Sequence, residues 1–276
     1  MDSMTVRRKL AIATWGAPRE GNIYGKLTLD ATNVLLWLEH IRETTGEKVT
    51  ITHFVGRAIG EALANAPSLN GYLRLNRYIP HKTVDIAYLV ALEEGANLAK
   101  AKVDNIDKKT VAEIAAELRM LATRLREGRD DDFKKAQEPL RFMPVWLIRK
   151  LVWLVGLLGS SFGMRIKALG IEPFQFGSAM ITSVGMFGLD EGYAPHTPFA
   201  RVPVLVVIGA MREAPLVVDG EVVIRNQITL TATIDHRFMD GYQGGVLAKT
   251  IRQCFAAPWS LEGHQAPPES IADRVV

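Results

Sequence analysis

The sequence predicts an α+β protein in which helices pack against a mixed β-sheet to form a sandwich. Strand-like and helix-like segments follow one another without the regular alternation of βαβ units. The stretch "VPVLVVIGAM" (202–211) is a continuous apolar run, short enough for a strand buried on both faces. The stretch "DKKTVAEIAAELRMLATRLREGR" (107–129) repeats apolar residues at helical spacing. The length suits one large domain or two small ones, and we expect a single domain over residues 1–276.

The first third of the chain contains the other well-marked elements. "NIYGKLTLD" (22–30) alternates apolar and polar residues, which predicts a half-buried strand. Asp30 is expected to cap a helix in "ATNVLLWLEHIRETTGE" (31–47). "TITHFVGRAIGEALANAP" (50–67) predicts a second amphipathic helix that ends at its proline, and "YIPHKTVDIAYLVAL" (78–92) predicts one or two strands.

The last third predicts strands that lead into a helix. "SAMITSVGMFG" (178–188) indicates a strand followed by a turn. "PLVVDGEVVI" (215–224) predicts a hairpin, because its Asp-Gly pair suits a type I′ turn. "IRNQITLTAT" (224–233) alternates as a final strand, and a helix is expected to begin at about Asp240.

Composition excludes several classes of protein. The formal net charge is +3, and basic residues do not form blocks interleaved with aromatics, which argues against nucleic-acid binding. The lone cysteine, Cys254, lies in an apolar helical pattern, so we expect a buried thiol in a reducing compartment. The first residues lack the pattern of a secretory signal, so a cytoplasmic location is expected. Five histidines have no metal-ligand spacing and are expected on the surface or in the core, without a metal: His40, His53, His81, His196 and His264.

A histidine stands between the final strand and the final helix, in "ATIDHRFMDGYQGG" (232–245). A neutral imidazole such as that of His236 can accept a proton from a thiol or hydroxyl near pH 7. Asp240 would support it indirectly, by fixing the turn through a buried ion pair with an arginine. Gly241 would permit tight packing or an unusual backbone angle. The spacing alone leaves a second interpretation open, that of a hydrogen-bonded histidine at the end of a strand.

Several further segments accompany the motif "DHRFMDG" (235–241), and together they form a series in a fixed order along the chain. The series resembles the catalytic domain of the dihydrolipoyl acyltransferases of 2-oxoacid dehydrogenase complexes and, more distantly, chloramphenicol acetyltransferase. The resemblance covers most of the chain except 129–173. It rests on 48–63 ("KVTITHFVGRAIGEAL"), 66–73 ("APSLNGYL"), 84–92 ("VDIAYLVAL"), 107–128, 174–188 ("FQFGSAMITSVGMFG") and 196–211 ("HTPFARVPVLVVIGAM").

The resemblance implies a coenzyme A-dependent acyltransferase. His236 would act as general base towards a thiol, hydroxyl or amine acceptor that attacks an acyl thioester. In the family a hydroxyl residue stabilises the oxyanion, and "ITSVG" places that role on Thr182, with Ser183 as the neighbour to test next.

The resemblance also implies a chloramphenicol acetyltransferase-like two-layer sandwich that assembles as a trimer or a multiple of trimers. Each active site would lie at a subunit boundary, so that His236 and Thr182 come from different chains. In the chloramphenicol branch an N-terminal arginine pairs with the aspartate, and either Arg7 or Arg8 would pair with Asp240 here.

The sequence departs from the family pattern in three ways. It contains no lipoyl attachment site, lipoyl domain, subunit-binding domain or Pro/Ala-rich linker, so we expect the catalytic-type domain to stand alone. The family's strand beside the substrate channel is replaced by "EEGANLAKAKV" (93–103). An apolar, basic insertion is expected at about 138–172.

Within the insertion, 141–171 contains no acidic residue. Arg149 and Lys150 interrupt its apolar run and make it a poor membrane span. Three roles stay open: packing within the domain or between subunits, a lid or wall for a long acyl chain, and contact with an anionic membrane surface. The alternative to an enzyme is a non-catalytic trimeric assembly module that docks a partner or a membrane through 141–171.

Overall fold

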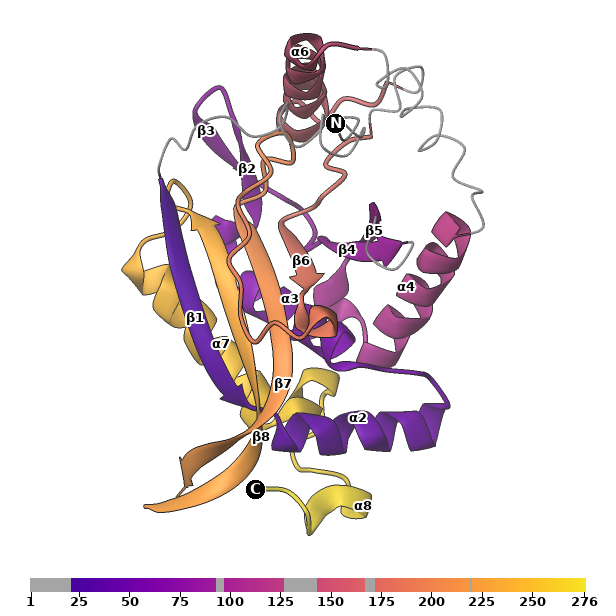
Figure 1. Ribbon diagram of the computed structural model, residues 1–276, viewed down its shortest axis with the longest axis vertical. Helices are drawn as coiled ribbons and strands as arrows, with labels where there is room; N and C mark the ends of the chain where they lie inside the picture. The colour runs from indigo at the N-terminus through magenta and orange to yellow at the C-terminus, as the bar shows by residue number, and fades with distance from the viewer. Residues whose placement is uncertain (1–20, 93–96, 127–142, 167–171, 219) are drawn as a thin grey trace, which may run out of the picture.

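The structure, a computed structural model, describes residues 21–92, 97–126, 143–166, 172–218 and 220–276 (Figure 1). Its strands are β1 (Asn22–Asp30), β2 (Gly71–Arg74), β3 (Arg77–Pro80), β4 (Ile86–Leu92), β5 (Asn97–Val103), β6 (Ala179–Ser183), β7 (Val204–Val218) and β8 (Glu221–Asp235). Its α-helices are α2 (Thr32–Thr45), α3 (Ile51–Asn65), α4 (Val111–Arg126), α6 (Val145–Val155), α7 (Gly241–Ala256) and α8 (Glu269–Ala272). Shorter helical turns are η1 (Pro67–Leu69), η3 (Ile106–Lys108), η5 (Gly156–Ser161), η7 (Gly185–Phe187) and η8 (Pro258–Glu262).

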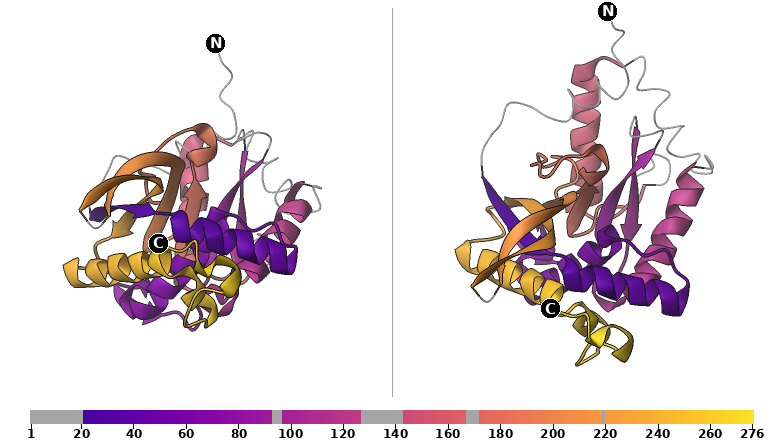
Figure 2. Two further views of the ribbon diagram at one scale, coloured as in Figure 1. Left: turned by 90° about the horizontal axis from the view of Figure 1, so that it is seen from below. Right: turned by 60° about the horizontal axis from the view of Figure 1, so that its bottom comes forward.

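Six strands form one mixed sheet in the order β1-β8-β7-β6-β4-β5. β6 runs parallel to both of its neighbours, β4 and β7, whereas the remaining pairs in the sheet are antiparallel. Helices α2, α3 and α7 lie together on one side of the strands, which the view from below shows (Figure 2). The predicted α+β sandwich with a mixed sheet is therefore confirmed.

The core lies between the sheet and these helices. Trp37 of α2, Phe54 of α3 and Ile114 of α4 are almost completely buried there. Each side chain of this size contributes roughly 1.5–3 kcal/mol by leaving water. Because side chains alternate along a strand, Ile181 of β6 packs into this core while Met180 packs into a smaller cluster on the other face.

The predicted elements near both ends of the sheet are confirmed, with two differences of detail. Helix α2 has Ala31 at its N-cap, one residue after the predicted Asp30, whose carboxylate accepts a hydrogen bond from Thr32 N at 2.8 Å. The predicted hairpin is the tip of a longer one, because β7 and β8 are each 15 residues long and extend beyond the sheet (Figure 1). Asp219 of the predicted turn lies outside the described residues, and Gly220 has φ 90°.

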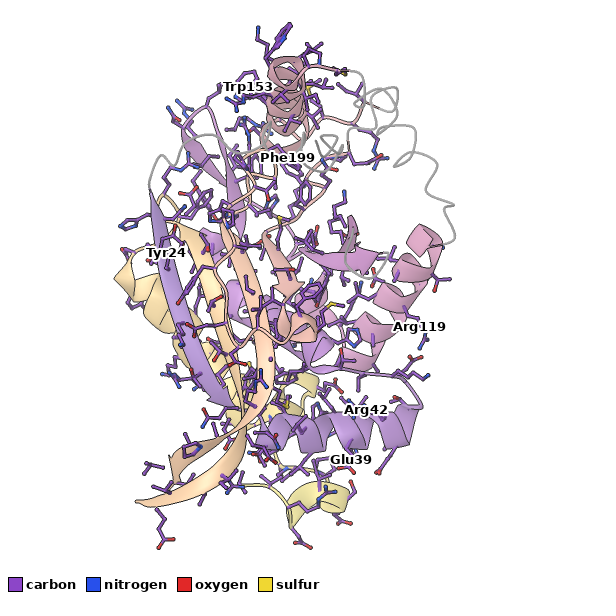
Figure 3. All side chains as sticks on the ribbon, in the orientation of Figure 1. Tyr24, Glu39, Arg42, Arg119, Trp153 and Phe199 are labelled. Carbon is purple, nitrogen blue, oxygen red and sulfur yellow. The ribbon has the colours of Figure 1, made fainter. Side chains whose placement is uncertain are left out.

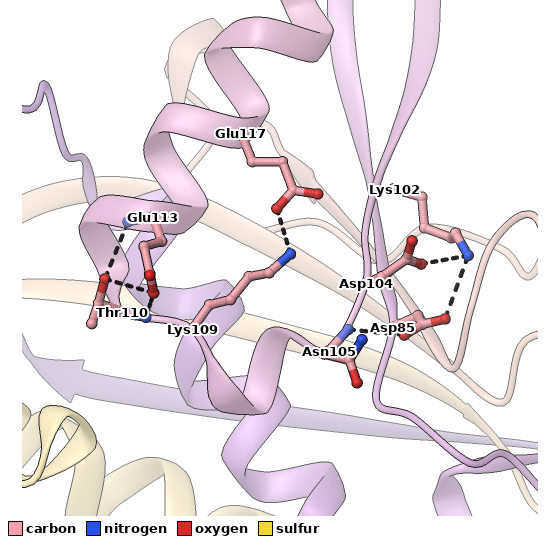
Figure 4. Close-up of polar contacts among 8 residues, drawn as sticks. All are labelled: Asp85, Lys102, Asp104, Asn105, Lys109, Thr110, Glu113 and Glu117. Carbon is pink, nitrogen blue, oxygen red and sulfur yellow. Dashed lines mark hydrogen bonds and ion pairs between the residues drawn. The ribbon is translucent and has the colours of Figure 1, made fainter.

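The segment 93–103, predicted as a departure from the family, still supplies an edge strand. β5 pairs with β4 in antiparallel register, and residues 93–96 lie outside the described part. Lys102 on this strand contacts Asp104 at 2.6 Å and Asp85 at 3.4 Å, and Asp85 also accepts a hydrogen bond from Asn105 N (Figure 4). The lysine therefore remains charged at the sheet edge through two carboxylates.

Helix α4 begins at Val111 because Thr110 and Glu113 cap it. Thr110 N donates to Glu113 Oε2 at 2.8 Å, and Glu113 N donates to Thr110 Oγ1 at 3.2 Å (Figure 4). This reciprocal pair satisfies backbone donors that a helix start leaves free. Lys109 adds an ion pair to Glu117 at 2.5 Å.

The described part of the predicted insertion forms α6 and η5. Figure 3 places Trp153 on α6 above Phe199. A Cβ atom on Gly156 would lie 2.7 Å from Phe199 O, so the segment rests directly on that backbone. Arg74 Nε donates to Ser161 O at 2.9 Å, and Arg201 donates to Ser161 Oγ at 2.6 Å. The C-terminal half of the segment is thus fixed to the domain.

Across the ranges that the structure describes, helices are too short or too polar to cross a membrane.

Candidate active site

His236 follows the last residue of β8, at a turn tied to two other strands. Asp235 N donates to Pro203 O at 2.9 Å, just before β7 begins. His236 N donates to Gly21 O at 2.7 Å, just before β1 begins. The side chain of His236 is exposed in the single chain. The fold therefore presents the imidazole at the end of the sheet on a backbone held from both sides.

A main-chain oxygen fixes the tautomer of the His236 ring. Nδ1 lies 2.7 Å from Met239 O. A carbonyl oxygen only accepts, so Nδ1 carries the hydrogen and donates it. The lone pair of the neutral ring is therefore on Nε2, which can accept a proton from a substrate. This hydrogen bond fixes both the tautomer and the ring orientation that a general base needs.

Asp235 and Arg237, on either side of the histidine, form an ion pair with several contacts. Arg237 Nε lies 3.0 Å from each carboxylate oxygen, and its Nη2 lies 2.5 Å from Oδ2. Burial alone would raise the pKa of Asp235, but the hydrogen bonds and charge of Arg237 outweigh it and hold that pKa below its usual value. The pair braces the turn that carries His236. The residue types Asp-His-Arg could have indicated this ion pair in the sequence, because residues i and i+2 around a turn can contact each other.

Asp240 and Gly241 begin α7. The carboxylate of Asp240 accepts from Tyr242 N at 2.9 Å, and Asp240 N donates to Gln243 Oε1 at 3.0 Å. Asp240 is therefore a helix N-cap, and its side chain is exposed in the single chain. Its buried ion pair with an arginine stays a prediction. A Cβ atom on Gly241 would contact nothing within 4 Å and its φ is not positive, so neither predicted reason for this glycine applies within one chain. The predicted partners Arg7 and Arg8 lie outside the described residues.

Thr182 and Ser183 end β6, and their side chains point to opposite faces of the sheet. Thr182 shares the face of Met180, away from the large helices. Gly185 begins η7, the turn that follows, and a Cβ atom there would lie 2.7 Å from Gly209 O. This close approach explains the glycine in "TSVG".

Thr182 and His236 do not meet within one chain. Thr182 pairs with Val207, which pairs with Thr231. Two strand spacings and the five residues from Thr231 to His236 separate them by about 19 Å. A hydroxyl and an imidazole at that distance cannot act on one acyl group, so a complete site needs a second chain or a different hydroxyl.

His196 is a further titratable side chain beside this turn, and Cys254 lies near the other end of α7. The His196 ring is in electrostatic contact with Asp235 and Arg237, and burial lowers its pKa despite the opposing charge of Asp235. No sequence motif marks this histidine, because the residues around it in space are distant along the chain. Burial raises the pKa of the Cys254 thiol to about 12, so the predicted buried thiol is confirmed and is not a nucleophile at neutral pH.

The remaining histidines have structural contacts. Nδ1 of His40 lies 2.8 Å from Ser270 Oγ, and His264 packs edge-on against Trp37. His81 packs between aromatic rings, and His53 accepts a hydrogen bond from Thr50 N at the start of α3.

Comparison with known proteins agrees with this fold. The chain belongs to the family of 2-oxoacid dehydrogenase acyltransferase catalytic domains, whose model matches residues 21–136 and 163–262. The match confirms the predicted family and leaves 137–162 unmatched. That the domain is single, with its insertion at about 138–172, stays a prediction.

One relative is the dihydrolipoyllysine-residue acetyltransferase component of the acetoin cleaving system of Bacillus subtilis (strain 168), 29% identical over 222 residues. The alignment covers 79% of this chain and 44% of the relative, and the chain spans about half the length of the curated relatives it matches.

Solved structures show the fold. The cubic core of the pyruvate dehydrogenase multienzyme complex superimposes with a TM-score of 0.65 at 18% identity, over 93% of this chain and 88% of the other. Chloramphenicol acetyltransferase superimposes with a TM-score of 0.50 at 10% identity, over 90% and 94%. The predicted chloramphenicol acetyltransferase-like fold is confirmed.

Proposed function

We propose that this protein transfers an acyl group between coenzyme A and a thiol acceptor, with His236 as the general base. The hydrogen bond from His236 Nδ1 to Met239 O carries the proposal, because it leaves Nε2 as the proton acceptor. The names of the relatives point to a dihydrolipoyl thiol as the acceptor.

His236 acts twice in the proposed reaction, first as a base and then, as the imidazolium, as an acid. Nε2 of His236 takes the proton of the acceptor thiol, and the sulfur attacks the carbonyl carbon of the acyl thioester. The tetrahedral oxyanion collapses, the bond from carbon to the sulfur of coenzyme A breaks, and that sulfur takes the proton back from the imidazolium. The charge is balanced throughout, and no metal ion takes part.

Thr182 is the proposed donor to the oxyanion. A positioned hydroxyl of this kind stabilises a transition state by about 3 kcal/mol. Because Thr182 and His236 lie about 19 Å apart in one chain by strand geometry, the proposed site combines His236 of one subunit with Thr182 of the next. Support comes from the fold shared with a cubic core, which is built from repeated subunit contacts. The proposed assembly is a homotrimer or a multiple of one.

The test is a thiol-release assay with acetyl-coenzyme A and free dihydrolipoamide, repeated with hydroxyl and amine acceptors. The proposal expects turnover with the dithiol that disappears in His236→Gln, which keeps a hydrogen-bond donor for Met239 O but has no base. Faster turnover with a hydroxyl or amine acceptor would leave His236 as the proposed base and replace the thiol as the proposed acceptor. Turnover unchanged in His236→Gln would defeat the mechanism.

A second candidate function rests on α6. Trp146 and Trp153 lie on its outer face and are 61% and 59% exposed, with Leu147 and Leu154 beside them. Lys150 lies 5.3 Å from the centre of the Trp146 ring. Exposed tryptophans next to basic residues are typical of helices that lie on an anionic membrane surface. We propose a peripheral membrane contact through this face, with or without catalysis.

A further inference from the structure

An apolar cavity of about 290 Å³ lies between the sheet and two helices. β1, β7 and β8 form one wall, and α3 and α7 form the other. Among its described lining residues only Lys26 carries a charge. Protein interiors seldom keep voids larger than a water molecule, because an empty space forfeits packing contacts. This partly open apolar space is therefore expected to have an apolar occupant.

The cavity adjoins the turn that holds His236. Met239, whose main-chain oxygen accepts from the His236 ring, lines it. Ile234, two residues before the histidine, also lines it. So does Ile23, two residues after the Gly21 oxygen that accepts from His236 N. The segments that orient the general base thus also contribute side chains to the lining of the cavity.

Gly244, in the first turns of α7, keeps this space open. A Cβ atom there would point at the thioether of Met239, 3.5 Å from Cε and 3.7 Å from Sδ. Leu247 and Ile251 continue the same helix face along the cavity. A glycine costs helix stability relative to most residues, which favours a spatial reason for it at this position.

We propose that this space, the acyl cavity, holds the hydrocarbon tail of a medium-length acyl thioester whose carbonyl lies at His236. The inference rests on the proposed acyl transfer and narrows its substrate class. A cavity of about 150 Å³ accepts benzene, so about 290 Å³ accommodates a chain of roughly six to ten carbons. The described residues of 141–171 do not line it, so the wall for the chain is α7 and the sheet rather than the insertion.

Two neighbouring glycines provide a matched test. Gly244→Leu fills the acyl cavity. Gly245→Leu makes the same change of helix propensity one residue later, where the position is exposed and a Cβ atom meets nothing within 4 Å. Gly244→Ala, which adds one methyl group at an ordinary contact distance, serves if the leucine variant does not fold.

The first measurement is binding of S-alkyl-coenzyme A thioethers with two to ten carbons, by calorimetry on the assembled protein. These ligands cannot transfer their chain, so binding is measured apart from catalysis. Wild type is expected to bind about fourfold tighter for each added carbon until the cavity is full. Gly244→Leu should bind the octyl thioether about 100-fold more weakly than wild type, with the ethyl thioether unchanged, and Gly245→Leu should behave as wild type. In Gly244→Ala the gain in affinity with chain length should stop one or two carbons earlier than in wild type.

The second measurement is acyl transfer from the matching thioesters to dihydrolipoamide. A chain-length gain in binding without transfer would uphold the acyl cavity and defeat the proposed function. Transfer with equal efficiency for acetyl and octanoyl groups, or equal profiles for Gly244→Leu and Gly245→Leu, would overturn the acyl cavity and leave the proposed function standing.

Discussion

The Nδ1 atom of His236 donates to the main-chain oxygen of Met239 over 2.7 Å, within the turn that joins β8 to α7. The acceptor belongs to the backbone, so the tautomer of the histidine depends on the turn and not on a second side chain. Substitution of the Met239 side chain is therefore expected to preserve the base, whereas loss of the imidazole removes it.

We expect His236→Ala to lower acyl transfer by about 100- to 10,000-fold, the range for loss of a general base. The fold of the subunit should not change, because the side chain is exposed in the single chain and its turn is held by main-chain bonds to Gly21 and Pro203. Initial rates of thiol release, with sedimentation and circular dichroism as controls, decide this. A rate close to that of wild type would show that another group is the base.

Thr182→Ala should lower turnover by about 100-fold with a smaller effect on substrate affinity, because its hydroxyl acts mainly in the transition state. Thr182→Ser should keep most of the activity. Ser183→Ala is the control, since the Ser183 side chain points to the other face of β6. If Ser183→Ala has the larger effect, the roles of these two residues are exchanged.

Mixing inactive chains tests the shared site. His236→Ala and Thr182→Ala trimers, exchanged with one another, should regain activity because some boundaries then carry both intact residues. The expectation follows from the distance of about 19 Å between these residues within one chain. Light scattering should show a trimer or a multiple of trimers. A monomer, or no recovery after exchange has been confirmed, would contradict the shared site.

Local signals predicted most of the fold and the position of the histidine. β1, α3, α4 and α7 follow alternation, helical spacing and caps that are read within one segment. The order of the strands in the sheet cannot be read in this way. β6 lies between β4 and β7, and this placement depends on contacts between residues that are distant in sequence.

Within the candidate site, too, contacts between residues that are distant in sequence, or contacts to the backbone, could not be predicted. The link from His236 to Met239 O uses a backbone atom, which leaves no trace in residue types. The closeness of His196 to Asp235 depends on the path of the chain before β7. The acyl cavity is a property of five elements together. Such features come from packing, and no short motif encodes them.

Stability should depend on pH through His53. Its Nδ1 accepts from Thr50 N at 3.0 Å at the start of α3, and burial lowers its pKa to about 4, against about 6.5 in the unfolded chain. Above pH 6.5 the ring is neutral in both states and the stability is fully present. As the pH falls from 6.5 to about 4 the unfolded state takes up the proton first, so stability is lost over that window.

His53→Gln keeps a side-chain acceptor for the cap and removes the titration. Its urea unfolding free energy should therefore fall less than that of wild type between pH 7 and pH 4.5, by roughly 1 kcal/mol for this partly exposed ring. His81 and His196, whose pKa values burial also lowers, are present in both proteins and cancel in the difference. Equal losses in the two proteins would remove His53 from the pH dependence.

The outer face of α6 gives the last prediction. Two exposed tryptophans, Trp146 and Trp153, share it with the basic side chains of Arg149 and Lys150, within a segment that has no acidic residue. Aromatic rings insert at the headgroup level, and each basic residue near an anionic surface adds about 1 kcal/mol that salt screens. The protein should therefore pellet with phosphatidylserine-containing vesicles at low salt, and less with neutral vesicles or at high salt.

The double variant Trp146→Ser, Trp153→Ser should lose this binding. Val222→Ser with Ile224→Ser is the matched control, because these side chains are equally apolar in character and even more exposed, at 73% and 74%, but lie on the β7–β8 hairpin. A different outcome is that wild type does not bind vesicles and the tryptophan variant dissociates the trimer. The face would then pack between subunits, because a helix face buried against another chain is not available to lipid. Equal loss of vesicle binding in both double variants would mean that exposed apolar area in general, and not α6, governs the contact.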